Sequence, residues 1–246
     1  MENIVPINLS RHIVLQREME VIANNVANST TNGFKRRAGH FGEALAKGAR
    51  GDAFRAGDRG ISFVLDRGSV LDLSQGASER TGNPLDVTIK GEAFFTVRTA
   101  AGERYTRNGA LGLNARGELV TSDGHPVLAE QGPLAFTAAD SDIAIASDGT
   151  VSTAQGVRGR LRLAAFANPQ ALENIGTNLF AAREAPRPAG AGARLEAGMI
   201  EKSNVSPVVE IARMIEVNRA YASLAQAAQK SDDLRRTAIT KLAEAA

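Results

Sequence analysis

Apolar residues recur at helical spacing near both ends of the chain. Near the beginning, the steps between them are four, three and four residues, which places one face of a helix at Leu15, Met19, Ile22 and Val26. Pro6 is tolerated in this helix because the first amides of a helix have no partner inside it. The pattern predicts a helix from Pro6 to Ala27.

A second, longer helix is predicted at the other end. Ser206, Pro207 and Glu210 are typical of a helix start, because they supply a capping oxygen, a preset φ and a negative charge for the helix dipole. With no intervening Gly or Pro, the apolar stripe runs through Met214, Val217, Tyr221, Leu224 and Ala228 to Leu242. At 1.5 Å per residue this helix spans roughly 55 Å, and the first helix about 33 Å.

The middle of the chain follows the period of a β-strand. Short segments such as DVTIKGEAFFTVR, GELVTS and DIAIAS alternate apolar and polar side chains. They are separated by turn pairs, which are Ala101-Gly102, Arg116-Gly117, Asp123-Gly124 and Asp148-Gly149. Antiparallel β-structure is therefore predicted in this region.

These patterns together predict an α+β fold. The N-terminal helix (residues 1–33) and the C-terminal helix (206–246) are expected to form a coiled-coil core domain, with an all-β domain (85–182) inserted between them. A glycine-rich extended connector (34–84) leads into the β domain, and a return connector (183–205) leads back to the second helix.

The unequal lengths of the two predicted helices leave apolar surface without a partner. A stripe of roughly 55 Å cannot be covered by a helix of about 33 Å, so we expect Leu224 and the residues beyond it to extend past the first helix. Copies or relatives of the chain could fill this seam, and contacts that do not close on themselves build helical filaments. The alternative is an intramolecular bundle in which both stripes form a core.

Four asparagines lie where the first helix ends. Asn disfavours helix interiors because its amide competes for nearby backbone groups, and it tolerates turns. The stretch from Asn28 to Gly33 is therefore interpreted as the end of the helix. Asn24 and Asn25 lie inside the helix, and we expect their side chains to bond across to other helices.

Composition restricts the chemistry of the chain. Its 246 residues include 29 Lys and Arg, 27 Asp and Glu, and no cysteine or tryptophan. Near-neutral charge without a basic stripe and interleaved aromatics argues against nucleic-acid binding, and the lack of cysteine excludes disulfides and thiolate metal sites. The first thirty residues lack the pattern of a secretory signal, and no apolar run of about 18 residues predicts a membrane span.

The sequence predicts no catalytic residue, cofactor or metal site. His12, His40 and His125 are widely separated and lack metal-type spacing. The acidic stretch DSDIAIASDG lacks the ligand order of a calcium-binding EF-hand loop, so Asp140, Asp142 and Asp148 are interpreted as residues of solvated turns. For the basic group from Lys35 to Arg37, a solvated loop or an ion pair between subunits is favoured over a phosphate contact.

Three motifs, in this order, resemble the bacterial flagellar rod and hook proteins. They are ANNVANSTTNGFK near the first helix, ERTGNPLDVTIKGEAFFTVR in the β region and SNVSPVVEIARMIEVNRAY at the last helix. The resemblance implies a structural, non-enzymatic subunit of a hollow rod that transmits motor torque. The terminal helices would form the inner coiled coil of that rod, and the β domain its outer layer.

The resemblance also implies a location and partners. The stretch DRGSVLDLSQGASERTGNPLDV is most similar to proximal-rod members of the family. The alternatives are a distal-rod or hook-type axial protein or, in a different class, a soluble enzyme with an intramolecular helical bundle. The expected partners are copies of the chain, other proximal-rod and distal-rod subunits, and the flagellar type III export apparatus. Nucleic acid, membrane insertion and a small-molecule substrate are not expected.

The rod would lie in the flagellar basal body and span the periplasm, after export without a cleaved signal peptide. The two helical stripes and the asparagines are expected to contact neighbouring subunits. The predicted interface set consists of Leu15, Met19, Ile22, Asn24, Asn25, Val26, Asn28, Met214, Val217, Tyr221, Leu224, Ala228 and Leu242.

Overall fold

The computed structural model describes residues 4–46, 61–176, 178–190 and 192–244. The chain divides into two compact units, each formed by segments that are distant in the sequence. The helical unit consists of Met1–Val26, Arg37–Val70 and Ser206–Ala246. The β unit consists of Ala27–Arg36 and Leu71–Val205.

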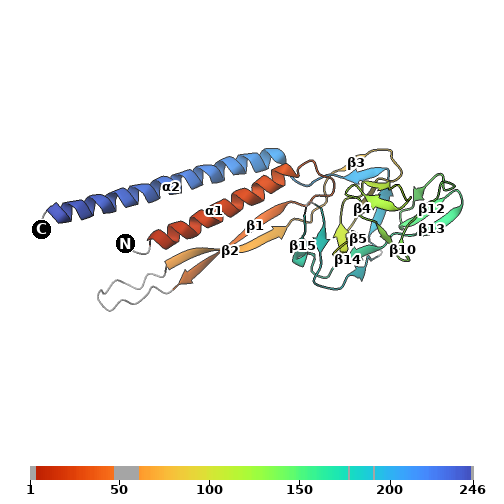
Figure 1. The fold of residues 1–246 in the computed structure, drawn as a ribbon, viewed down its shortest axis with the longest axis horizontal. Helices are drawn as coiled ribbons and strands as arrows, with labels where there is room; N and C mark the ends of the chain where they lie inside the picture. Colours follow the sequence, from red (N-terminus) through yellow and green to blue (C-terminus); the bar gives the residue numbers. More distant parts are fainter. Residues whose placement is uncertain (1–3, 47–60, 177, 191, 245–246) are drawn as a thin grey trace. The chain divides into compact units, whose positions relative to one another are not determined.

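The described residues form two α-helices, one 3-10 helix and nineteen strands (Figure 1). In chain order these elements are α1 (Ile4–Ala27), β1 (Arg37–Ala46), β2 (Ile61–Leu71), β3 (Ser78–Arg80), β4 (Val87–Lys90), β5 (Phe94–Thr99), β6 (Gly102–Thr106), β7 (Leu111–Leu113), β8 (Leu119–Thr121), β9 (Leu128–Ala129), β10 (Gly132–Pro133), β11 (Ala144–Ile145), β12 (Thr150–Thr153), β13 (Gly156–Arg160), β14 (Leu163–Ala165), η1 (Pro169–Ala171), β15 (Glu173–Asn174), β16 (Phe180–Ala181), β17 (Arg187–Pro188), β18 (Arg194–Ala197), β19 (Met199–Glu201) and α2 (Pro207–Glu244).

The helical unit contains α1, α2 and the paired strands β1 and β2. Both predicted helices are confirmed, and their observed bounds lie within two residues of the predicted ones. The two helices run side by side in opposite directions, and β1 and β2 lie along α1 (Figure 1). Neither described helix is long and apolar enough to span a bilayer.

The β unit is built around a six-stranded sheet with the order β15-β16-β6-β5-β14-β17. The strands predicted from period-2 alternation are confirmed, and β5 pairs with β6 as an antiparallel hairpin. All four predicted turn pairs lie between strands, and the glycine of each has a positive φ. The main core gathers buried residues from strands on both sides of these turns, among them Ile89, Phe95, Leu119 and Val151.

The predicted fold class is wrong in its central features. The described chain is mostly β, and its two helices share one unit with β1 and β2 instead of forming a separate coiled-coil core domain. The predicted extended connector, residues 34–84, contains β1, β2 and β3. Glycine suggested weak structure there, but β2 accommodates Gly68 at a φ of 92°, and its segment ISFVL is rich in residues that favour strands.

Candidate assembly surface and buried junction

Cross-helix contacts fix the register of α1 against α2. The pairs in contact are Asn25 with Glu210, Glu18 with Arg213, and His12 with Tyr221. From pair to pair, the residue number in α1 falls while the residue number in α2 rises, which shows that the two helices are antiparallel. Near the beginning of α1, a small cavity of about 260 Å³ is lined by Asn8, Leu9 and His12, and its α2 side extends from Leu224 to Asp232. In the described chain, the cover that α1 gives to α2 therefore ends near Asp232.

Asn25 explains why an asparagine lies inside α1. The side chain is fully buried, and its amide nitrogen donates to the backbone oxygen of Arg37 at 2.8 Å and to the Glu210 carboxylate at 3.0 Å. Its amide oxygen accepts from the backbone N–H of Arg37 at 2.9 Å. One side chain therefore connects α1 to both β1 and α2. The predicted bond from Asn25 to another helix is confirmed by its contact with Glu210. Asn24 is exposed.

Asn28, the third asparagine of the predicted interface set, forms hydrogen bonds at the end of the helix. Its backbone oxygen accepts from the N–H of Thr31 at 3.2 Å, and its side-chain oxygen accepts from the Thr31 hydroxyl at 3.3 Å. These bonds form the turn that follows α1. The interpretation of Asn28 to Gly33 as the end of the helix is confirmed, because α1 ends at Ala27.

Members of the predicted interface set differ in exposure within this chain. Ile22, Asn25 and Val217 are buried, Asn24 and Leu242 are exposed, and the half-buried members are Leu15, Met19, Val26, Asn28, Met214, Tyr221, Leu224 and Ala228. The expectation that Leu224 extends past the first helix is wrong, because Leu224 lines the cavity together with Leu9 and His12 of α1. The helices pair further along α2 than their predicted lengths suggested.

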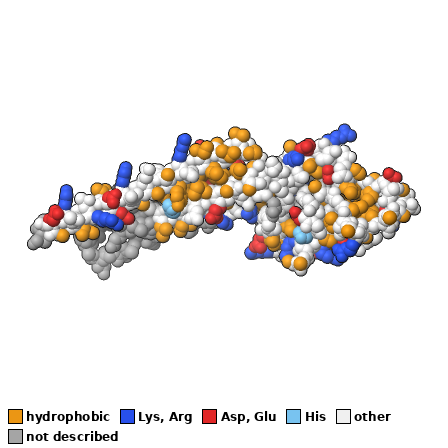
Figure 2. Space-filling view, turned by 45° about the horizontal axis from the view of Figure 1, so that its top comes forward, with side chains coloured by type: hydrophobic (Ala, Val, Ile, Leu, Met, Phe, Trp, Pro, Cys, Tyr) orange, Lys and Arg blue, Asp and Glu red, His pale blue; other side chains and the backbone are white. Residues whose placement is uncertain are grey.

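A second apolar stripe on α2 is exposed, and the sequence reasoning missed it. Its members Val208, Ile211 and Ile215 recur at steps of three and four residues. At 100° per residue, Ile215 lies half a turn from Leu224, so this stripe faces away from the side that α1 covers. We call Val208, Ile211 and Ile215 the outer stripe. Hydrophobic side chains gather on the helical unit in Figure 2.

The free end of α2 carries further exposed apolar residues. Leu234, Ile239 and Leu242 lie beyond Asp232 and are each about 70% exposed. We call the apolar residues on the α1 side of α2, which include Val217, Tyr221 and Leu224, the inner stripe. Leu242 lies eighteen residues, or five full turns, after Leu224, so it continues the inner stripe. The inner stripe therefore continues beyond the part that α1 covers.

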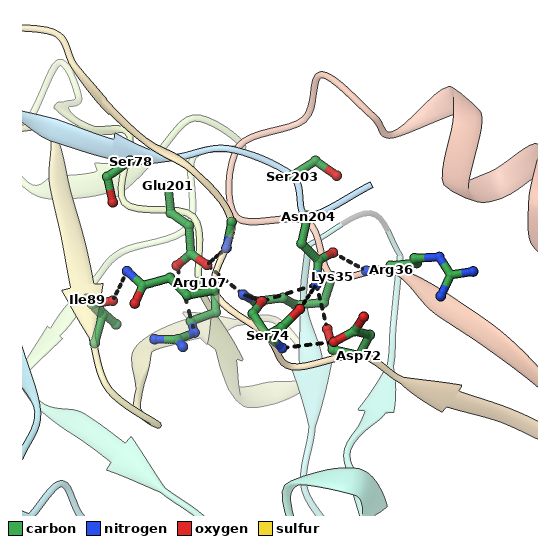
Figure 3. A network of polar contacts seen from close by, with 12 residues as sticks. Lys35, Arg36, Asp72, Ser74, Ser78, Ile89, Arg107, Glu201, Ser203 and Asn204 are labelled. Carbon is green, nitrogen blue, oxygen red and sulfur yellow. Dashed lines mark hydrogen bonds and ion pairs between the residues drawn. The ribbon is translucent and has the colours of Figure 1, made fainter. Parts of the chain in front are cut away.

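In the β unit, four segments that are distant in the sequence meet in one polar network (Figure 3). Its centre is a buried ion pair in which Lys35 Nζ donates to Glu201 Oε1 at 2.5 Å. The same carboxylate oxygen accepts from the backbone N–H of Gly76 at 3.0 Å, and Lys35 also donates to the Ser74 carbonyl at 2.7 Å. The Nε atom of Arg107 lies 4.0 Å from Glu201 Oε2. We call Lys35, Arg107 and Glu201 the junction triad.

The junction triad places two cations around one carboxylate. The side chains of Lys35, Arg107 and Glu201 are at most 4% exposed. Desolvation lowers the pKa of Lys35 and the pKa of Arg107, while the charge of Glu201 opposes both shifts. Glu201 is thus the group that allows both cations to be buried.

Backbone contacts surround the junction triad. The Asn204 side chain accepts from the N–H of Arg36 at 2.7 Å and donates to the carbonyl oxygen of Asp72 at 2.8 Å. Gly33 donates its N–H to the Glu201 carbonyl at 2.7 Å and has a φ of 69°. A Cβ on Gly33 would lie 2.5 Å from the carbonyl carbon of Arg107, so only glycine fits this position.

The interpretation of Lys35 as a solvated or intersubunit charge is wrong. Its side chain is buried within its own chain and pairs with Glu201, which lies 166 positions away. No local pattern connects these residues, and a Lys followed by two Arg is usually a surface feature. The available signal was the NGFK segment, in which a glycine and a buried aromatic, Phe34, directly precede the lysine.

Asp140 and Asp148, from the acidic stretch DSDIAIASDG, stabilise turns in this chain. The Asp140 carboxylate accepts from the backbone N–H of Thr137 at 2.8 Å, and the Asp148 carboxylate accepts from that of Thr150 at 3.0 Å. Both aspartates lie in turns, as predicted, but the Asp140 side chain is not solvated, because it is buried against Arg158. Across the described ranges, His, Asp and Glu side chains form no group of three or more that could hold a metal ion.

Three family models match separate parts of the chain. Residues 9–35 match the flagella basal body rod protein model, and residues 88–153 match the flagellar hook protein FlgE/F/G D1 domain. Residues 196–241 match the C-terminal model of the flagellar basal body rod FlgEFG proteins.

Full-length similarity points in the same direction. The chain is 36% identical to the flagellar basal-body rod protein FlgF of Caulobacter vibrioides, over 98% of both chains. It is 31% identical to FlgF of Mesorhizobium japonicum, over 96% of this chain and 98% of that protein. It is 33% identical to the basal-body rod protein FlgG of Bacillus subtilis, over 89% of this chain and 91% of that protein.

Proposed function

The chain belongs to the flagellar basal-body rod protein family, and we propose that it joins the rod through the exposed apolar surfaces of α2. It is a structural subunit of the proximal-rod type and most resembles FlgF. Its place is the flagellar basal body, where it assembles with other axial subunits. Enzymatic activity has no part in this proposal.

The proposal also includes a route of export and a position within the basal body. The chain would cross the inner membrane through the flagellar type III export apparatus, without a cleaved signal peptide, and build the part of the rod that spans the periplasm. Support for this location comes from the basal-body rod proteins that the chain matches. Neighbours along the rod would be copies of this chain and proximal-rod or distal-rod relatives.

The exposed apolar residues of α2 carry the assembly proposal. Val208 is 78% exposed on the face of α2 opposite α1, and Leu242 is 72% exposed on the inner face, beyond the part that α1 covers. A contiguous exposed apolar stripe on a folded unit is typical of an interaction site. Within the predicted interface set, Leu242 is directly available to a neighbour, whereas Ile22, Asn25 and Val217 support the helix pair from inside.

Glutamate substitutions in the outer stripe and at the free end test this proposal. Ile215→Glu and Leu242→Glu each place a charge where a neighbouring apolar surface would pack, so each variant should be missing from purified basal bodies. The free chains should melt within about 2 °C of wild type, because both side chains are exposed before assembly. The measurement compares the amount of subunit recovered in basal bodies with the melting temperature of the free chain.

Ser223→Glu provides the matched control, because it introduces the same charge at an exposed α2 position outside the two surfaces. This variant should be recovered in basal bodies at the wild-type level. Normal recovery of both Ile215→Glu and Leu242→Glu would refute assembly through α2. A strain that lacks the gene but still forms a complete rod would refute the proximal-rod function itself.

A further inference from the structure

The β unit contains a large groove that the assembly proposal does not use. Its volume is about 910 Å³, and its lining comes from β13, β14, β17 and the loops before β12 and β18. This size is sufficient for several residues of a bound chain. The charged residues of its lining are Arg160, Arg162, Arg187, Arg194, Glu130 and Asp148.

The groove has an excess of positive charge. Four guanidinium groups line it against two carboxylates. The Asp148 carboxylate is already held by the backbone and hydroxyl of Thr150, at 3.0 and 2.8 Å. Arg160 lies 3.8 Å from Glu130, and Arg162 lies 2.5 Å from Glu103 at the edge of the groove.

Arg187 and Arg194 form the part of the groove that is open to a ligand. Both side chains are exposed, and within the described ranges neither makes an ion pair. Thr96 also lines the groove; it is 1% exposed, and its hydroxyl has no hydrogen-bond partner in the described structure. A groove whose lining contains two exposed guanidinium groups without ion pairs and a buried hydroxyl without a partner favours a ligand that carries negatively charged and hydrogen-bonding groups.

The edge of the sheet at this groove does not accept an added strand. Ala189 donates its N–H to the Leu163 carbonyl of β14, and Ala164 pairs with Pro188, so the backbone at Pro186 and Pro188 faces away from β14. Proline has no N–H, and this outer edge therefore lacks the donors that strand addition requires. Recognition in the groove must come from side-chain charge.

We propose that this groove binds an acidic peptide segment of an adjacent axial subunit, through its carboxylates and the guanidinium groups of Arg187 and Arg194. This inference rests on the proposed function, because assembly supplies the neighbouring protein. Guanidinium groups bind carboxylates in paired geometry, and charge complementarity fixes which surfaces meet. The contact would add specificity to an assembly driven by the apolar surfaces of α2.

A labelled glutamate peptide tests the groove without any rod. Fluorescein-labelled hexaglutamate should bind the purified full-length chain in fluorescence polarisation at low salt, and binding should weaken as salt rises. Arg187→Glu combined with Arg194→Glu should lower the affinity at least about tenfold. The control combines Arg116→Glu with Arg183→Glu, which reverse two exposed arginines outside the groove and should change the affinity less than about threefold.

Three outcomes would overturn the groove proposal. They are the absence of hexaglutamate binding to wild type, equal losses in the two double variants, and binding of inorganic polyphosphate but not of hexaglutamate. Melting temperatures of all variants confirm that each chain is folded.

Recovery from basal bodies separates this proposal from the proposed function. If wild type and the Arg187→Glu/Arg194→Glu variant are recovered equally, the groove has no role in assembly and the rod function stands. If wild type itself is absent from basal bodies, the rod function fails, whatever the groove binds. Selective loss of the groove variant supports both proposals.

Discussion

Glu201→Gln should destabilise the β unit more than any other single change in the junction triad. The substitution keeps the size and the acceptor oxygen of the side chain but removes its charge. Lys35 and Arg107 would then remain buried without the carboxylate that they share, which lies 2.5 Å from Lys35 and 4.0 Å from Arg107 in the wild type. Removing one partner of a buried ion pair typically costs about 3–5 kcal/mol.

Lys35→Met should be milder, because the triad contains two cations. After this change Glu201 still has Arg107 at 4.0 Å, where two charges attract by about 4 kcal/mol at an effective dielectric constant of about 20, before desolvation is subtracted. Methionine also avoids the desolvation that lowers the pKa of Lys35. We expect a loss of about 1–2 kcal/mol. The double variant should be more stable than Glu201→Gln alone, since one uncompensated cation remains instead of two.

Urea unfolding of the full-length chain at pH 7, followed by circular dichroism, measures these differences in free energy. The matched control is Glu196→Gln, which makes the same change in the half-exposed pair with Lys90, whose atoms lie 3.6 Å apart. This control should cost less than about 1 kcal/mol. The reasoning fails if Glu201→Gln costs no more than Lys35→Met, or if the double variant is less stable than Glu201→Gln.

Two further predictions concern other parts of the chain. The pKa of Asp140 lies below its ordinary value, because its carboxylate accepts a hydrogen bond from the Thr137 backbone N–H and, with a smaller effect, from the Arg158 guanidinium. The ionised carboxylate therefore stabilises the fold above the pKa of Asp140 in the unfolded chain, and this stabilisation is lost as the pH falls through the pKa of Asp140 in the folded chain. Asp140→Asn should therefore lower the melting temperature at pH 7, and a gap from wild type that fails to narrow between about pH 4 and pH 2 would contradict this assignment. In hydrogen exchange of the unassembled chain, the amides of residues 233–244 should exchange faster than those of residues 211–231, because the contact between α1 and α2 ends near Asp232. Equal protection of the two segments would show that another part of the chain covers the end of α2.

Local signals explain the part of the fold that the sequence predicted correctly. Helix spacing, the start at Ser206 to Glu210 and the glycine turns act within a few residues, and the structure confirms the elements they predicted. β1 and β2 were missed because their glycines outweighed the strand-forming residues between them. Asn25 carried a long-range signal, since an amide buried in a helix requires partners, but the sequence did not identify β1 and Glu210 as those partners.

Which faces of α2 are exposed was predicted less well, because periodicity alone does not identify what covers each face. The inner stripe of α2 was interpreted as a contact with neighbouring chains, and most of it lies against α1 within this chain. The outer stripe has the same helical spacing and was overlooked beside it. Two apolar faces on one helix imply two partners, and only the register of the partner helix shows which face is already covered.

The junction triad connects the three segments that match family models. The first match ends at Lys35, the second includes Arg107 and the third includes Glu201. Because both buried cations depend on the carboxylate of Glu201, the triad forms only when all three segments are present. The outer stripe also lies in the third segment, but its side chains are exposed and belong to the helical unit, so an exchange of Val208 or Ile211 for another apolar residue should leave the junction triad intact. The motifs that identify the family therefore share a buried contact in the β unit, whereas substitutions at exposed positions of α2 would change the proposed assembly surface without unfolding the subunit.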